Sequence, residues 1–276
     1  MKSAQTVLAV DLDGTLLLEN DRLHPQDTAL LKRGLPFTLI FATGRSLSGV
    51  RRPLVGNGLS NGGPVNYPLV IHNGALSYLP GERLLEHLLF SHQVAAALVK
   101  VGLGHPEATF LFQGERQVWQ LWDTPAGARG IEMYGFEPLM YQPDAAHLPA
   151  FSKWMCLSEQ RSVLDSVANE LEGLPIQGNY SLSNIYEATP QGVDKARGLK
   201  KIMVSLGLEE MRLIAVGDGD NDLGMFALAD CSFALAHGSE HVRQKADYVI
   251  DSSENGLLGP ILEREWKGVN FLQAQS

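Results

Sequence analysis

Short apolar runs, rich in Val, Ile, Leu and Phe, recur along this chain with helix-like stretches between them. Continuous apolar strands that alternate with helices are typical of a parallel sheet that helices cover on both faces. We therefore predict an α/β fold whose core is a doubly wound, Rossmann-like parallel sheet. The strands are expected at TVLAV (6–10), FTLIFA (37–42), PLVIH (68–72), RLIAV (212–216) and SFALA (232–236), with a short last strand at DYVI (247–250). The helices are expected over 25–34, 46–54, 193–206 and 221–229.

The middle of the chain follows a different pattern. From about residue 82 to residue 187, the strand-like stretches alternate between apolar and polar residues, as in a sheet with one face exposed to water. Helices are expected near 91–102 and 159–173. We interpret 82–187 as an inserted α+β domain between two parts of the core domain, 1–81 and 188–276. Its tryptophans are expected to pack within the sheet rather than to stack on a sugar: Trp119, Trp122 and Trp154.

Composition narrows the range of partners and locations. The net charge is −9, from 22 Lys and Arg against 31 Asp and Glu, which argues against nucleic acid or an anionic lipid surface as the main partner. No apolar run approaches membrane-spanning length, and Asp11 comes too early to leave room for a signal-peptide hydrophobic region. Cys156 and Cys231 are far apart and are expected to be reduced thiols. We expect a cytoplasmic protein, and the sequence leaves open whether it is a monomer or a weak dimer.

Four of the apolar runs end in a polar residue at the point where the strand should stop. These residues are Asp11, Thr43, Asn73 and Asp218. In a doubly wound sheet, ligands bind outside the carboxyl ends of the strands. Segments that are distant in the sequence are therefore expected to form one site.

Several carboxylates would meet in this site. In DLDGT, Asp11 and Asp13 are two residues apart, so an extended backbone would direct both side chains to the same side. GDGDND adds Asp218 and Asp222. Neighbouring carboxylates repel each other unless a cation or a proton lies between them. A divalent cation with oxygen ligands resolves this repulsion, and Mg²⁺ suits a site that also holds a phosphate.

Three other kinds of site fit the sequence poorly. An EF-hand loop needs Gly at its sixth position and Glu at its twelfth, and a count from Asp218 finds Leu223 and Ala229 there. A count from Asp11 fails in the same way. A zinc site would lack His and Cys ligands at motif spacing. A dinucleotide site would need Gly-x-Gly-x-x-Gly after the first strand, and the sequence has none there.

A phosphate in the site would need a cation and hydrogen-bond donors. Thr43 and the backbone N–H of Gly44 are candidate donors, and Lys195 is the candidate cation. Lys195 falls in the first turn of its expected helix, where the helix dipole disfavours a positive charge. This placement points to function, although an isolated lysine is more often a solvated surface charge.

Taken together, DLDGT, ATGRS, Lys195 and GDGDND resemble, in this order, the four motifs of the haloacid dehalogenase-like superfamily of phosphohydrolases. The segment inserted between the second and third motifs resembles the C2-type α+β cap of the Cof-type subgroup. HNGA (72–75), GVDK (192–195) and ADYVIDSSENGL (246–257) add to the likeness. Four motifs in order with correct strand placement are a specific signal.

The resemblance implies roles for the residues of the first three motifs. Asp11 resembles the nucleophile that forms an aspartyl-phosphate. Asp13 resembles the general acid that later serves as the base. Thr43, Gly44 and Lys195 resemble phosphate-binding positions.

The fourth motif resembles a Mg²⁺ site. Asp218 resembles the acidic ligand, beside the carboxylate of Asp11 and the backbone carbonyl of Asp13. Asp222 resembles a supporting acid of the metal site, and Asn221 resembles a further phosphate contact.

Two stretches depart from the subgroup pattern. The fourth motif is followed by AHGSEHV (236–242) where a Gly-Asn-Ala-like segment is usual, which leaves His237 and His241 without an assigned role. HNGA begins with His72, where the subgroup often has a polar amide or an acid. Both departures concern the identity of the substrate more than the core chemistry. For Arg45, we expect an ion pair with an acid of the core in preference to a contact with substrate.

The resemblance implies a Mg²⁺-dependent phosphatase that acts on a small phosphorylated metabolite. Residues 83–187 contain 6 Lys and Arg against 12 Asp and Glu, which disfavours a multiply anionic leaving group and favours a sugar or polyol phosphate. Two alternatives stay open. A phosphomutase of the phosphomannomutase type would depend on a bisphosphate activator. A non-catalytic sugar-phosphate-binding regulatory module would bind its ligand without turnover.

Overall fold

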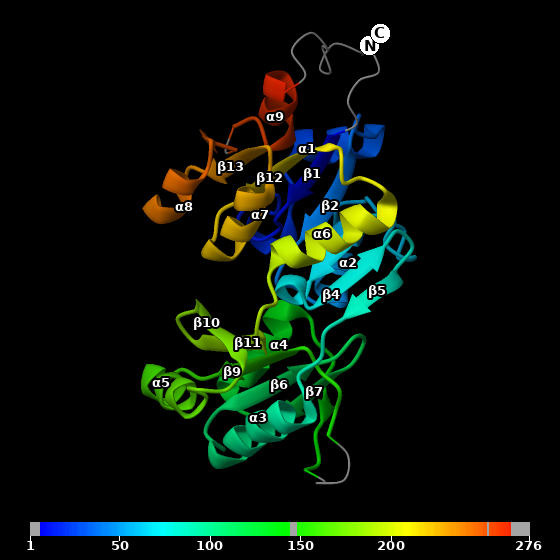
Figure 1. Ribbon diagram of the computed structural model, residues 1–276. Helices are drawn as coiled ribbons and strands as arrows, with labels where there is room; N and C mark the ends of the chain where they lie inside the picture. The colour runs from blue at the N-terminus through cyan, green and yellow to red at the C-terminus, as the bar shows by residue number, and fades with distance from the viewer. Residues whose placement is uncertain (1–5, 144–147, 253, 266–276) are drawn as a thin grey trace.

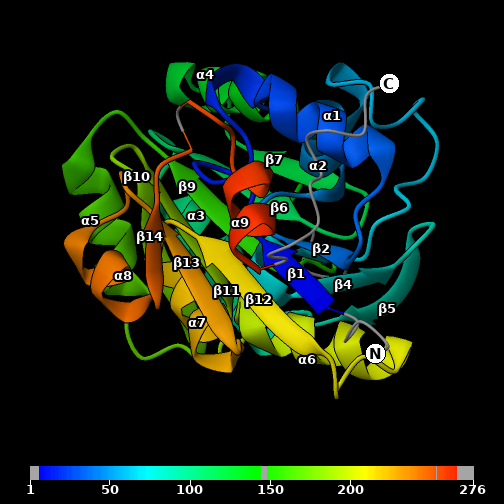
Figure 2. The ribbon, with the colours of Figure 1, turned by 90° about the horizontal axis from the view of Figure 1, so that it is seen from above.

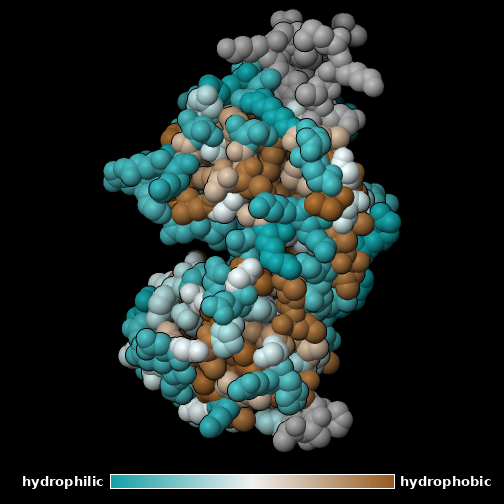
Figure 3. Space-filling model, in the orientation of Figure 1, coloured by the Kyte–Doolittle hydropathy of each residue, from teal (hydrophilic) through white to brown (hydrophobic). Residues whose placement is uncertain are grey.

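The computed structural model describes residues 6–143, 148–252 and 254–265, and they form two lobes, each built around its own sheet (Figure 1). The larger sheet has the strand order β14-β13-β12-β1-β2-β3-β4-β5, and the smaller sheet has the order β10-β11-β9-β6-β7-β8. The chain leaves the larger lobe once and returns once. The face shown in Figure 3 is hollowed between the two lobes.

Six neighbouring strands of the larger sheet run parallel, as the sequence predicts. They are β14 (Tyr248–Ile250), β13 (Cys231–Leu235), β12 (Arg212–Gly217), β1 (Thr6–Val10), β2 (Thr38–Ala42) and β3 (Leu69–Ile71). An antiparallel hairpin, β4 (Leu76–Leu79) and β5 (Arg83–His87), extends the sheet beyond β3. The predicted start of the inserted segment falls in the turn of this hairpin, so that segment contributes one strand to the larger sheet.

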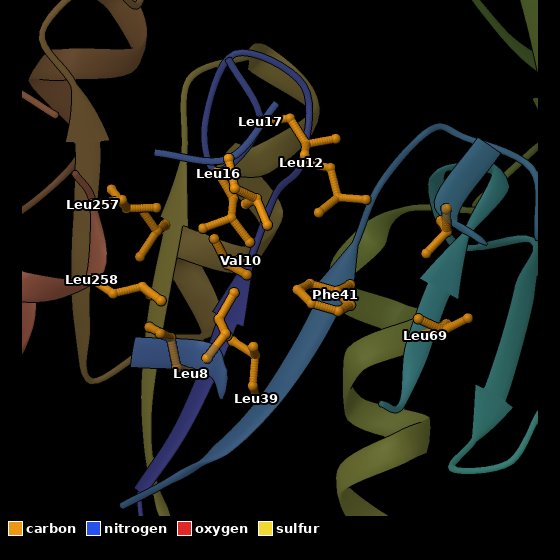
Figure 4. Close-up of a cluster of buried hydrophobic side chains, with 14 of the residues drawn as sticks. Leu8, Val10, Leu12, Leu16, Leu17, Leu39, Phe41, Leu69, Leu257 and Leu258 are labelled. Atoms are coloured by element: carbon orange, nitrogen blue, oxygen red, sulfur yellow. The ribbon is translucent and has the colours of Figure 1, made fainter. Parts of the chain in front are cut away.

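Helices cover both faces of the larger sheet, which confirms the doubly wound α/β fold (Figure 2). Leu8 and Val10 belong to a buried cluster with apolar residues of α1 (Pro25–Arg33), α2 (Leu47–Gly56) and α9 (Leu258–Glu265), part of which is shown in Figure 4. Val7 and Ala9 belong to a second cluster with residues of α6 (Lys195–Leu206), α7 (Leu223–Leu228) and α8 (Glu240–Lys245). Because successive side chains of a strand point to opposite faces, the unbroken apolar run of β1 supplies both clusters.

The helices of this lobe agree with the predicted ones and add two near the C-terminal end. They are α1 (Pro25–Arg33), α2 (Leu47–Gly56), α6 (Lys195–Leu206), α7 (Leu223–Leu228), α8 (Glu240–Lys245) and α9 (Leu258–Glu265). Short 3₁₀ turns lie in the connections that follow β1, β3 and β12: η1 (Glu19–Asp21), η2 (His72–Gly74) and η3 (Asp220–Asp222). In the described part of the chain, no helix is both long enough and apolar enough to cross a membrane.

The smaller sheet is packed on both faces, so the expectation of one water-exposed face is wrong for its centre. Strands β6 (Thr109–Gln113) and β9 (Lys153–Leu157) are buried at every position. Helices α3 (His92–Gly104) and α5 (Arg161–Glu170) cover one face, and α4 (Pro125–Tyr134) packs on the other face, toward the larger lobe (Figure 1). Two of the polar positions that suggested a wet face, Lys153 and Glu187, are buried against the larger lobe.

The other elements of the smaller lobe complete an α+β arrangement. The helices are α3 (His92–Gly104), α4 (Pro125–Tyr134) and α5 (Arg161–Glu170), and the remaining strands are β7 (Val118–Leu121), β8 (Leu139–Met140), β10 (Ile176–Leu182) and β11 (Ile185–Pro190). All strand pairs are antiparallel except β7 with β8.

The tryptophans of the smaller lobe pack in its core, as expected. Trp154 is fully buried, with its ring centre 5.2 Å from that of Phe110. Trp119 and Trp122 are partly buried against the same cluster. Trp122 also donates its indole N–H to the backbone carbonyl of Gly102 at 2.8 Å. These rings therefore stabilise the lobe by packing.

Candidate active site

The carboxyl ends of four adjacent parallel strands bring the polar strand-end residues together. Asp11 follows β1, Thr43 follows β2, Asn73 follows β3 and Asp218 follows β12. Thr15 Oγ1 donates a hydrogen bond to Asp218 Oδ1 at 3.2 Å, across 203 positions of sequence. The backbone N–H of Asn73 donates to the carbonyl of Thr43 at 3.1 Å. The strand order β12-β1-β2-β3 makes these distant segments neighbours.

Lys195 joins two buried carboxylates at this site. Its Nζ lies 2.7 Å from Asp11 Oδ1 and 2.7 Å from Asp222 Oδ1. All three residues are buried. Burial by itself lowers the pKa of Lys195, but the two carboxylates outweigh it and raise that pKa above its ordinary value. Lys195 is therefore a permanent positive charge next to Asp11.

Helix α6 carries Lys195 to the site because the helix starts close to β3. The helix begins at Lys195, two residues after the predicted start at 193, so Lys195 lies in its first turn as predicted. The Asp194 side chain caps the helix by accepting the N–H of Arg197 at 2.6 Å. A Cβ on Gly74 would lie 2.0 Å from the carbonyl oxygen of Asp194, and one on Gly198 would lie 2.6 Å from Val70. Glycine at both positions permits this close approach of helix and sheet.

Asp222 uses both of its carboxylate oxygens within the protein. Oδ1 accepts from Lys195, and Oδ2 accepts the backbone N–H groups of Asp218 and Gly219 at 3.0 Å each. Gly217 leaves room for this arrangement, since a Cβ there would lie 2.3 Å from Asp222 Oδ2. Asp222 thus holds the loop that carries Asp218 and fixes the position of Lys195.

Three carboxylates lie close enough to hold a divalent cation. One oxygen from each of Asp11, Asp218 and Asp222 lies within 4.8 Å of the other two. Burial raises the pKa of Asp11 above its ordinary value, and the charge of Lys195 opposes this effect. Burial also raises the pKa of Asp218, and the charge of Asp222 adds to the effect. Carboxylates this close together resist being ionised at the same time unless a cation lies between them. Because their oxygens are the ligands that Mg²⁺ prefers, this set of donors fits Mg²⁺.

Asp13 has a different environment from Asp11. Its side chain is 57% exposed, whereas the side chain of Asp11 is 6% exposed. Arg45 donates from Nε to both carboxylate oxygens of Asp13 at 3.0 Å. Arg45 also pairs with Asp21 at 2.6 Å, which confirms the expected ion pairing with acids of the core. The negative charge of Asp13 adds to the raised pKa of Asp11, so the carboxylate of Asp13 is close enough to repel that of Asp11.

The loop after β2 is held by contacts from two directions. Thr43 is fully buried, and its Oγ1 accepts the backbone N–H of Arg45 at 3.1 Å. Gly44 lies close to Asn73, because a Cβ there would be 2.9 Å from Asn73 Oδ1. The carbonyl of Gly44 accepts a hydrogen bond from Lys153 Nζ at 2.9 Å. Lys153 is in β9, so the smaller lobe contacts this loop directly.

Lys153 and Glu187 belong to a polar link between the lobes that the sequence analysis missed. Lys153 Nζ lies 2.8 Å from Glu187 Oε2, and each side chain is 7% exposed. Asn73 donates from Nδ2 to Glu187 Oε1 at 3.2 Å and accepts from Asn221 at 3.2 Å. The sequence signal that could have identified them is a Lys and a Glu inside otherwise apolar strands, in FSKWMCL and NIYEA, because buried Lys and Glu side chains are usually paired.

The three histidines without an assigned role lie in different surroundings. His237 Nε2 is 3.4 Å from Asp218 Oδ2, so this residue borders the carboxylate group. His72 is fully buried with Nδ1 3.0 Å from Ser152 Oγ, and burial lowers its pKa well below the ordinary value. His72 therefore stays neutral at the junction of the lobes. His241 is exposed on α8.

Comparison with known proteins agrees with this arrangement. The family model of haloacid dehalogenase-like hydrolases matches residues 8–259. A 5-amino-6-(5-phospho-D-ribitylamino)uracil phosphatase from Bacillus subtilis is 23% identical, over 91% of this chain and 94% of its own. A solved structure from Thermotoga maritima has a TM-score of 0.80 at 20% identity, covering 94% of this chain and 97% of its own. A sugar phosphatase of subclass IIB of this superfamily has a TM-score of 0.72 at 19% identity, covering 90% and 94%.

A doubly wound core with acids at its strand ends and an inserted α+β lobe defines a hydrolase of the phosphatase class. This chain belongs to the haloacid dehalogenase-like hydrolases, since the family model covers nearly all of it. The resemblance that the four motifs indicated is thereby confirmed for the family.

Proposed function

We propose that this phosphatase uses Mg²⁺ and an aspartyl-phosphate intermediate to hydrolyse a small phosphorylated metabolite, a sugar or polyol phosphate. The observation that carries the proposal is the buried 2.7 Å contact between Asp11 and Lys195 at the end of β1. A carboxylate held beside a lysine can attack a phosphoryl group whose negative charge the lysine balances.

The proposed reaction has two steps, and Asp11 and Asp13 act in both. Asp11 attacks phosphorus and forms an acyl phosphate, while the bond from phosphorus to the leaving oxygen breaks and that oxygen takes a proton from Asp13. Asp13 then takes a proton from a water molecule that attacks the acyl phosphate. This second step releases phosphate and restores Asp11. The exposure of Asp13 suits a group that must reach both the leaving group and water.

The phosphate is proposed to lie between the loop after β2 and the first turn of α6. Thr43 and the N–H of Gly44 would donate to its oxygens from one side, and Lys195 and Asn221 from the other. Lys195 would also balance charge on the transferring phosphoryl group, the main requirement of such a reaction.

For the metal, we propose the carboxylates of Asp11 and Asp218 and the backbone carbonyl of Asp13 as ligands. Asp222 would support the metal site indirectly, because N–H donors already occupy both of its oxygens. When bound, Mg²⁺ would supply positive charge against the phosphoryl oxygens.

The smaller lobe supports the choice of a sugar or polyol phosphate. Lys153 and Glu187 neutralise each other, so the link between the lobes offers donors and acceptors for hydroxyl groups without a free charge for a second phosphate. Tyr134, at the end of α4, adds a phenol near the site: burial raises its pKa, and the charges of Glu187 and Asp13 add to the shift. The names of the ribitylaminouracil phosphatase and the sugar phosphatase both indicate polyhydroxylated substrates.

We also propose that 82–187 acts as a cap domain over a core formed by 1–81 and 188–276, of which residues 1–5, 144–147, 253 and 266–276 lie outside the described structure. A cap that meets the phosphate loop through Lys153 would exclude water during the first step. For location, we propose the cytoplasm, since Cys156 and Cys231 are both free and buried.

The first test is phosphate release from a panel of phosphorylated sugars and polyols, with and without Mg²⁺, alongside a folded Asp11→Asn variant. We expect Mg²⁺-dependent release that the variant loses. Normal turnover by Asp11→Asn would overturn the nucleophile assignment. Phosphate transfer that requires a bisphosphate activator would favour a mutase, and binding without release would favour the regulatory module.

A further inference from the structure

Arg45 is shared between the proposed acid–base residue and a second carboxylate. Its Nη2 lies 2.5 Å from Asp13 Oδ1 and 2.6 Å from Asp21 Oδ1. Its Nη1 donates to the backbone carbonyl of Gly49 in α2 at 2.9 Å. The guanidinium is therefore fixed by three groups, and only one of them belongs to the proposed catalytic pair.

Asp21 continues this series of contacts to the smaller lobe through Arg52. Arg52 donates from Nε to Asp21 Oδ2 at 2.7 Å and from Nη2 to the carbonyl of Met133 at 3.0 Å. Met133 is in the last turn of α4. A Cβ on Gly135, which caps that helix with a φ of +64°, would lie 2.7 Å from Arg52 Nη1. The end of α4 is thus shaped to receive Arg52.

The loop that carries Asp21 is itself well held. The Asp21 side chain is 13% exposed, and its backbone carbonyl accepts from Asn57 Nδ2 at 2.8 Å. Asp21 has a φ of +61°, a left-handed conformation that Asp and Asn tolerate better than other residues with a side chain. Burial works against ionisation, but Arg45 and Arg52 lower the pKa of Asp21 below its ordinary value. Asp21 is therefore a fixed negative charge.

We propose that Asp21 and Arg52 are positioning residues that keep Arg45 and Asp13 aligned with the docked smaller lobe, an inference that rests on the proposed acid–base role of Asp13. Asp21 pairs with the same guanidinium that contacts both carboxylate oxygens of Asp13, so a second acid holds Arg45 in place. Asp21 keeps the guanidinium paired throughout, and Arg52 connects this arrangement to α4. The acid–base residue is then in its working position when the lobe is seated over the site.

The test compares leaving groups, because the first step needs the acid only when the leaving oxygen is a poor leaving group. We would measure single-turnover release of the leaving group, which reports the first step alone, from the best sugar or polyol phosphate and from p-nitrophenyl phosphate. For Asp21→Asn and Arg52→Gln, we expect the alkyl phosphate to react about tenfold or more slowly, while p-nitrophenol release changes by less than about twofold. Asn at position 21 keeps the tolerance for a positive φ and removes only the charge.

Arg129→Gln is the matched control. Arg129 lies on the same helix α4 and forms an exposed ion pair with Glu159, so its loss should change neither rate. Asp13→Asn shows the effect of losing the acid itself. Suppose that Asp13→Asn slows the alkyl phosphate more than p-nitrophenyl phosphate, but Asp21→Asn and Arg52→Gln slow both substrates equally or slow neither. The positioning role is then wrong, and the proposed function stands. If Asp13→Asn does not discriminate, the acid–base assignment fails together with the inference. Arg52 is 48% exposed, so Arg52→Gln decides the question if Asp21→Asn does not fold.

Discussion

Lys195 and Asp11 form an ion pair with 2.7 Å between Nζ and Oδ1, and their side chains are 1% and 6% exposed. Asp222 completes the group from the other side of the ammonium, also at 2.7 Å. Two carboxylates thus share one buried positive charge, which makes Lys195 important both for the folded state and for the proposed chemistry.

Replacing Lys195 with Met should destabilise the protein. The substitution retains most of the side-chain volume but leaves two buried carboxylates without their cation. We expect a loss of about 3–5 kcal/mol in the free energy of unfolding, measured by urea titration, and loss of phosphate release. Lys201→Met is the control on the same helix, because Lys201 is 50% exposed and 3.8 Å from Glu86, and it should cost less than about 1 kcal/mol. Equal, small losses for both variants would contradict the importance of the buried group.

Replacing Gly14 with Ala should impair the proposed metal site. Gly14 has a φ of +72°, and a Cβ there would lie 2.3 Å from Asp218 Oδ2, so Asp218 would have to move. Gly34→Ala is the control, since Gly34 has a φ of +86° and no atom within 4 Å of its Cβ position. Both variants should lose about 1–3 kcal/mol of stability from backbone strain. Only Gly14→Ala should need more Mg²⁺ for half-maximal phosphate release, and the same Mg²⁺ requirement in both would argue against Asp218 as a ligand.

His105 predicts a pH dependence of stability. Its ring nitrogens lie 2.9 Å from Glu107 and 2.7 Å from Glu170, and although burial opposes it, these carboxylates raise the pKa of His105 above 6.5. Because the folded-state pKa is raised, the stabilisation is fully present below the unfolded-state pKa and is lost as the pH rises through the folded-state value. The partners are about half exposed, so we expect a contribution of about 0.5–1 kcal/mol.

The measurement is a urea titration of the wild type and of His105→Gln at pH 5.5 and pH 8.5. The wild type should exceed the variant in stability by more at pH 5.5 than at pH 8.5. A difference that is independent of pH would mean that the protonated histidine contributes nothing.

The amino-acid sequence by itself was sufficient to identify the sheet, the strand ends and the polar residues that follow them. Asp11, Thr43, Asn73 and Asp218 can be grouped from their sequence positions because a doubly wound parallel sheet places all of its carboxyl ends along one edge. The position of Lys195 at the start of a helix, against the helix dipole, was only a weak signal, and the resemblance of the four motifs made Lys195 a candidate. The signals at the strand ends and at the helix start are local, and each can be read within one element.

The smaller lobe shows where local patterns mislead. Lys153 and Glu187 follow the alternation of a half-exposed strand, but the face they occupy is buried against the larger lobe. Alternation reports which side chains share a face of a sheet, and it carries no information about what covers that face. The expected wet face and the missed link between the lobes have this one cause.

Tertiary structure alone decided how the charges are paired. The pattern DLDGT predicts that both carboxylates point to the same side, but it does not predict that the fold buries Asp11 with Lys195 and leaves Asp13 half exposed beside Arg45. The path from Asp13 through Arg45, Asp21 and Arg52 to α4 joins two loops and helix α2 of the larger lobe to a helix of the other lobe. The strength of an ion pair depends on the distance and burial of its partners, which only the packed chain determines, whereas the strand ends follow from the periodicity of the sequence itself.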